Sequence, residues 1–159
     1  RVHNAVLYAD LQKFPRWRTI LSQFHAEEFT HQGRRFSTAE HAWHFVKLRA
    51  IGDDKNAELF ALDSASDLSR ASPSDAKRQG GKNGLHQMTC DEAFLWEKQK
   101  AVLIASMIHD KFTQSDLCRS VLLATRDARL LHQVPRAALP RAFEIIPGLH
   151  ETRATLRKS

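Results

Sequence analysis

The chain has 159 residues and a mass of 18.1 kDa, with 42% hydrophobic and 26% charged residues. This length and balance exclude a fibrous or disordered protein and favour one globular domain over residues 1–159, able to bury about two-thirds of its unfolded surface. The formal net charge of +6 predicts attraction to anions such as phosphate esters, nucleotides or nucleic acid.

The sequence gives three indications of where the protein resides. No stretch approaches the roughly 18 apolar residues that a membrane span needs, and no basic and then apolar run near the N-terminus resembles a signal peptide. Two cysteines, Cys90 and Cys118, are fewer than a small secreted disulfide framework usually carries. We therefore expect an intracellular, cytoplasmic protein without a membrane partner.

The N-terminal half predicts short elements followed by one well-defined helix. Residues 5–17 suggest a short strand and then a loop, and HQGRRFST, residues 31–38, suggests a turn at Gly33 followed by a second short strand. Ser37 or Thr38 is placed to cap a helix over residues 39 to about 50, and Gly52 closes it.

The C-terminal half predicts mainly helices. Ser72 and Pro73 begin a short helix that ends at Gly80, and the run from Asp91 to Phe112 predicts a long core helix. Further helices are expected over residues 116–131, capped by Ser115, and after Pro147. The predicted fold class is therefore mainly α with a small β component (α+β).

Three polar side chains share one line of the helix over residues 39–50. At 100° per residue, Glu40, His44 and Lys47 lie within about 40° of one another on a helix that is otherwise largely apolar. Such a stripe suits the wall of a pocket. It also suits a solvent-facing surface on which Glu40 pairs with His44 or Lys47, an interaction worth only about 0.2–0.5 kcal/mol. His41 and His44 lack further ligands at suitable spacing, so we expect no metal.

The segment FSTAEHAWHFVK, residues 36–47, resembles the signature of the NADAR domain family. That signature has an aromatic and a small residue, Glu-His, an aromatic or small residue, and then Gln and a closing Lys. The similarity continues in order through residues 21–156, in the blocks LSQF, ASPSDAKRQGGKNG, WEKQKAVLIASMIHDKF, LLATRDARLLH and LHETRATL. Six blocks in the right order make the resemblance specific.

The resemblance implies an enzyme that cleaves N-glycosidic bonds, without a cofactor. Members of the family hydrolyse ribosylamino-pyrimidine phosphates or remove ADP-ribose from guanine in DNA, so the expected partner is a nucleotide or ADP-ribosyl substrate, including ADP-ribosylated nucleic acid. The family glutamate corresponds to Glu40, expected as the acid–base group. The family lysine corresponds to Lys47, expected to hold a phosphate or ribose oxygen, and the family tryptophan corresponds to Trp96, expected to stack on the base or to anchor the core.

The sequence departs from the family pattern at three places. His44 replaces the usual Gln, and Gly80-Gly81 replaces a Gly-Arg pair, so that Lys82 is expected to supply the missing charge. The segment with Asp, Trp and Gly is replaced by HQVPRAALPRAFEIIPG, residues 132–148, which has His132 where the family has glutamate. There Arg136 and Arg141 are expected to favour a pyrophosphate-bearing substrate, with stacking on Trp96 and on Trp43 or Phe24.

Three functions therefore stay open at this point. The first is an N-glycosidase that acts on an ADP-ribosyl or ribosylamino substrate. The second is a catalytically weakened module that binds such nucleotides without cleaving them. The third is a basic nucleic-acid-binding protein, which is less favoured because aromatic residues are not interleaved with the basic ones.

Overall fold

A computed structural model describes residues 9–133 and 143–159 of the chain. Its helices and strands follow one another as η1 (Asp10–Lys13), α2 (Trp17–Leu21), β1 (Phe29–His31), β2 (Arg34–Phe36), α3 (Ala39–Ala50), α4 (Asp54–Glu58), η2 (Leu62–Ser64), α5 (Asp67–Arg70), α6 (Pro73–Gly80), α7 (Cys90–Gln114), α8 (Asp116–Ala124), β3 (His132–Gln133), β4 (Phe143–Glu144) and α9 (Leu149–Leu156). Helices with two small antiparallel sheets make up the described part of the chain, so the predicted α+β, mainly helical class is confirmed.

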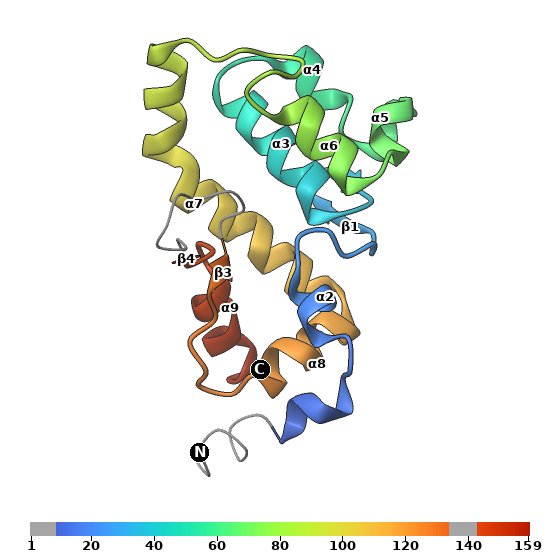
Figure 1. Ribbon diagram of the computed structural model, residues 1–159, viewed down its shortest axis with the longest axis vertical. Coiled ribbons are helices and arrows are strands. Elements are labelled where there is room, and N and C mark those ends of the chain that lie inside the picture. Colours follow the sequence, from blue (N-terminus) through green and yellow to red (C-terminus); the bar gives the residue numbers. More distant parts are fainter. Residues whose placement is uncertain (1–8, 134–142) are drawn as a thin grey trace.

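The long helix α7 connects two groups of shorter elements (Figure 1). Helices α3 to α6 lie together on one side of α7 and pack against it mainly through α3, whereas α2, α8 and α9 lie around its C-terminal half. Thr89 begins α7 with a capping box, in which its side chain accepts from the Glu92 amide while the Glu92 carboxylate accepts from the Thr89 amide. The predicted long core helix is therefore present, with bounds Cys90–Gln114.

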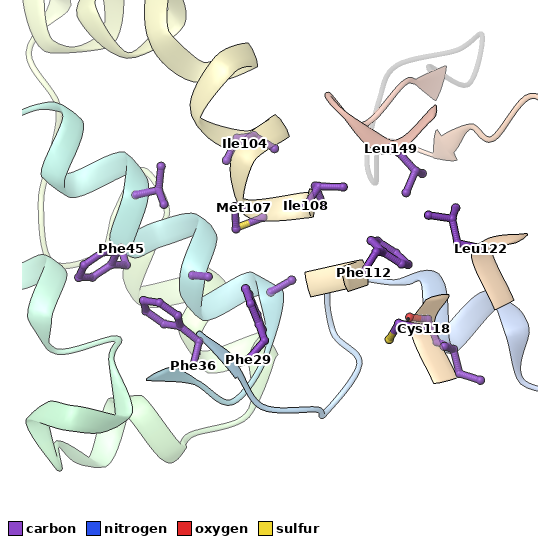
Figure 2. Close-up of a cluster of buried hydrophobic side chains, with 14 of the residues drawn as sticks. Phe29, Phe36, Phe45, Ile104, Met107, Ile108, Phe112, Cys118, Leu122 and Leu149 are labelled. Carbon is purple, nitrogen blue, oxygen red and sulfur yellow. Dashed lines mark hydrogen bonds between the residues drawn. The ribbon is translucent and has the colours of Figure 1, made fainter. Parts of the chain in front are cut away.

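The core lies on both sides of α7 (Figure 2). On one side Phe36 and Phe45 pack edge to face, with ring centroids 5.0 Å apart, and Met107 contributes from α7. On the other side, Phe112 of α7 lies close to Leu122 of α8. Burying side chains of this size stabilises the fold by about 1.5–3 kcal/mol each, which joins the two groups of helices through α7.

Each small sheet is a pair of short strands with a defined register. Strands β1 and β2 pair Phe29 with Phe36, and the turn between them has positive φ at both Gln32 and Gly33, as a tight two-residue hairpin requires. The expected turn at Gly33 and the strand that follows it are thus confirmed. Strands β3 and β4 are antiparallel and pair His132 with Glu144 and Gln133 with Phe143.

Most local predictions hold, and two need correction. The helix expected over residues 116–131 ends at Ala124, and Arg126 then adopts a positive φ of 47°, which a helix does not tolerate. The N-terminal stretch forms a 3-10 helix from Asp10 and the short α2, while residues 5–8 of the expected strand lie outside the described residues. Among the described residues, no helix is both long and apolar enough to cross a membrane.

Candidate active site

Helix α3 is buried around most of its circumference, and this burial shelters Glu40. Thr38 caps the helix by accepting a hydrogen bond from the His41 amide, as its position in the sequence predicts. Glu40 is 7% exposed and His44 is 6% exposed. The polar stripe therefore does not face bulk water, which decides between the two interpretations of the sequence.

Glu40 and His44 form a sheltered pair. Their Oε1 and Nε2 atoms are 3.2 Å apart, and His44 Nδ1 is buried with no hydrogen-bond partner among the described residues. Burial lowers the pKa of His44, although the hydrogen bond to Glu40 opposes this. When Glu40 is ionised, a neutral His44 carries its proton on Nε2, so the imidazole donates to Glu40 and Nδ1 keeps a free lone pair.

Lys47 continues the stripe but is already bound to the protein. Its ammonium donates to the carbonyl of Gly80 at the end of α6. Burial lowers the pKa of Lys47, and the charge of Glu40 opposes that shift. Lys47 therefore links α3 to α6 next to the Glu40–His44 pair.

A pocket of about 310 Å³ opens in front of Glu40. Its lining residues are Ser22, Gln23, Phe24, Glu40, Trp43, His44, Lys77, Gly81, His132, Glu144 and Ile146. The volume lies at the small end of the usual range for ligand pockets, about 300–1,000 Å³. The pocket therefore combines two carboxyl groups, two imidazoles, one ammonium and two aromatic rings.

The wall that precedes β1 is fixed by two hydrogen bonds. The Glu40 amide donates to the Gln23 carbonyl over 3.0 Å, and the Lys111 ammonium of α7 donates to the Ser22 carbonyl over 2.6 Å. These contacts hold residues 22–24 against the start of α3. Phe24, which is 37% exposed, is thereby placed at the pocket with its ring 5.7 Å from the Lys77 ammonium.

The structure brings some of the predicted site residues together. Phe24, Glu40 and His44 line the pocket, as does Trp43, which was expected as an alternative stacking residue. Trp96 is 4% exposed and belongs to the hydrophobic core instead of the pocket lining, so its anchoring role is the one that the geometry favours. Lys82 is exposed beside Gly81 and is not a lining residue, whereas Arg136 and Arg141 lie outside the described residues.

Sequence reasoning missed three charged or titratable lining residues. Lys77 lies one turn before Gly81 on the exposed side of α6. In the sequence it could not be distinguished from the basic residues around it. His132 and Glu144 were treated as part of a segment that had lost the family's second acid. The β3–β4 pairing carries both to the pocket, so a second carboxyl group lines it after all.

The fold and the pocket together define a class of protein: a small, mainly helical α+β domain with a sheltered acid–imidazole pair at a recess of about 310 Å³. The family model of the NADAR domain matches residues 12–139, and the chain belongs to that family. Membership associates the chain with N-glycosidase-type chemistry. No curated protein matches the chain.

Proposed function

We propose that the protein is a hydrolase that cleaves the N-glycosidic bond of an ADP-ribosyl or ribosylamino nucleotide, with Glu40 as the acid–base group. One observation carries the proposal: a carboxyl group that is almost fully buried, hydrogen-bonded to a neutral imidazole, still borders an open pocket. Sheltered carboxyl groups of this kind serve as general acids and bases.

The reaction needs one proton transfer and one attack by water. As the bond between the anomeric carbon and nitrogen breaks, positive charge develops on the sugar, and the departing nitrogen takes a proton. Water then bonds to the anomeric carbon and loses its own proton. Glu40 can supply the first proton and accept the second, while the carboxylate form also stabilises the developing positive charge.

Other lining residues suit the parts of such a substrate. Lys77 presents an ammonium for a phosphate or ribose oxygen, a role that the sequence assigned to Lys47 and Lys82. Phe24 and Trp43 offer aromatic faces for the base. Glu144 offers a second carboxyl group that can orient the attacking water.

The second candidate is a module that binds such nucleotides without cleaving them. It is favoured by residues 132–148, which lack the aspartate and tryptophan expected from the family pattern. It is opposed by Glu144, because this residue offers a carboxyl group at the same pocket.

The test presents purified protein with guanine-ADP-ribosylated DNA, ADP-ribosylated nucleosides and a ribosylamino-pyrimidine phosphate, and measures released base and sugar by mass spectrometry. We expect the wild type to cleave at least one substrate and Glu40→Gln to cleave none. Tight binding without any cleavage would leave the binding module as the function. Binding of unmodified nucleic acid alone, with no preference for the ADP-ribosyl group, would favour a general nucleic-acid binder.

A further inference from the structure

A second pocket adjoins the one at Glu40. It has a volume of about 480 Å³ and shares Ser22, His132 and Ile146 with the Glu40 pocket. We call it the Trp17 pocket; its other lining residues are Leu11, Trp17, Arg18, Leu21, Ala128, Arg129, Leu130, Leu131, Gln133 and Leu149. Because three residues border both spaces, a ligand with two parts can extend from one to the other.

The Trp17 pocket combines an aromatic face with positive charge. The Arg18 guanidinium carbon lies 4.2 Å from the centre of the Trp17 ring, which is a stacked arrangement. Arg129 enters from the segment that follows α8. The rest of the lining is largely aliphatic, so the pocket is suited to a flat apolar group that carries a negative charge.

No carboxylate of the described residues neutralises these two exposed guanidinium groups. Within residues 9–133 and 143–159, neither Arg18 nor Arg129 forms an ion pair, although several other surface arginines do. Arg126, for comparison, lies 2.7 Å from the carboxylate of Asp10. The positive charge in the Trp17 pocket therefore remains available for an anionic ligand.

We propose that the Trp17 pocket is a subsite for an aromatic base that carries a phosphate, such as the adenosine monophosphate part of a larger substrate. Stacking on the Trp17–Arg18 pair would hold the base, and the two arginines would bind the phosphate. The assignment of this group to the substrate cleaved at Glu40 rests on the proposed function. A subsite for such a group would favour a substrate of the ADP-ribosyl class over the shorter ribosylamino monophosphate.

The composition of the pocket argues against simpler ligands. Arg18 and Arg129 are exposed at the pocket, so a purely apolar ligand would gain nothing from their charge, and inorganic phosphate would leave the aromatic and leucine side chains unused. Only a ligand with both parts uses the whole lining.

The experiment titrates AMP, adenosine and inorganic phosphate into wild type, Arg18→Ala and Arg129→Ala by calorimetry. Arg70→Ala serves as the matched control, because Arg70 is exposed on α5 and its loss changes the net charge equally. We expect each pocket variant to weaken AMP binding about tenfold or more, Arg70→Ala to leave it unchanged, and added salt to weaken it in the wild type. Adenosine should bind at least about tenfold more weakly than AMP and respond little to either variant.

Three results would overturn the inference. The first is that Arg18→Ala and Arg129→Ala weaken AMP binding no more than Arg70→Ala does. The second is that adenosine binds as tightly as AMP. The third is that AMP and ADP-ribose bind at the same time. Competition between AMP and ADP-ribose would support one continuous site.

The outcome stays distinct from that of the proposed hydrolysis. Glu40→Gln should bind AMP as the wild type does, because Glu40 is not a lining residue of the Trp17 pocket. AMP binding that depends on the arginines, with no cleavage of any substrate, would reject the hydrolase and retain the subsite. Cleavage of a substrate without such AMP binding would retain the hydrolase and reject the subsite.

Discussion

Glu40 is the side chain whose chemistry can be separated from its structural role. Glu40→Gln keeps nearly the same shape and an oxygen that can accept from His44 Nε2, but it removes the ionisable proton. We expect loss of at least about a hundredfold in kcat, the usual contribution of general acid–base catalysis, with ligand affinity largely retained. Single-turnover cleavage and equilibrium binding of the same substrate measure the two effects. A folded Glu40→Gln protein with full activity would show that another group transfers the proton.

The two lysines near Glu40 should respond differently to substitution. Lys77 lines the pocket, so Lys77→Ala should weaken binding of a phosphorylated ligand about tenfold while affecting the matching nucleoside little. Lys47 donates to the Gly80 carbonyl, so Lys47→Ala should instead lower the free energy of unfolding by about 1–3 kcal/mol. Lys55→Ala, on the exposed surface of α4, is the charge-matched control for both. A selective loss of phosphate binding in Lys47→Ala alone would restore the role that the family resemblance implies.

The approach of α6 to α3 depends on the absence of a side chain at Gly80. A Cβ at this position would lie 2.1 Å from Cγ and 2.2 Å from Nδ1 of His44, well inside van der Waals contact. The imidazole therefore packs directly against the glycine backbone, and this close approach explains how Nδ1 can be buried without a partner among the described residues.

Gly80→Ala should consequently displace His44. In an ordinary helical position, alanine stabilises by about 1 kcal/mol relative to glycine, so a destabilised Gly80→Ala protein would reveal the clash. We expect a lower free energy of unfolding, measured by urea titration, together with reduced activity, because His44 no longer orients Glu40. Ser74→Ala, on the exposed part of the same helix, should show neither effect. Unchanged stability and activity in Gly80→Ala would mean that α6 can move away without cost.

Elements with local signals could be predicted from the sequence, whereas contacts across the chain could not. The cap at Thr38, the turn at Gly33 and the Pro73 start of α6 each depend on nearby residues, and each lies where the pattern indicates. The hydrogen bond between Glu40 and His44 follows from their spacing of four residues on one helix. These parts of the fold and site are encoded within a few residues.

The remaining part of the site is assembled by long-range contacts. The Lys47 ammonium binds a carbonyl 33 residues away along the chain. His132 pairs with Glu144 between two strands of only two residues each. Strands of that length have no detectable alternation of apolar and polar residues. Trp96 illustrates the same limit, because its family position is compatible with stacking on the base or with anchoring the core, and only its burial in the folded chain favours the second role.

At the scale of the whole molecule, Lys111 connects α7 to the pocket wall. Its side chain is 4% exposed, and its ammonium donates to the carbonyl of Ser22, which borders both pockets. Burial lowers the pKa of Lys111 to about 8, although the nearby Cys118 and Glu27 act in the opposite direction. Keeping this lysine charged in the core therefore costs folding free energy at neutral pH.

The pH dependence of stability should reveal that cost. Between the folded pKa of about 8 and the ordinary value of 10.5, the unfolded chain binds more protons at Lys111 than the folded protein. The contribution of Lys111 to the free energy of unfolding therefore rises with pH across this range, by up to about 3 kcal/mol. Lys111→Met keeps the length of the side chain and cannot titrate, so its stability should lack this rise.

Cys118 has to be controlled in the same measurement, because burial raises the pKa of its thiol above the ordinary value. The contribution of Cys118 to the free energy of unfolding therefore falls as pH rises. Urea unfolding of Cys118→Ala and of Cys118→Ala/Lys111→Met, compared at several values between pH 8 and 10.5, isolates the lysine. As pH rises, the free energy of unfolding of Cys118→Ala should increase relative to that of Cys118→Ala/Lys111→Met. A difference that is constant with pH would mean that Lys111 titrates normally and that the wall of residues 22–24 is held without a buried charge.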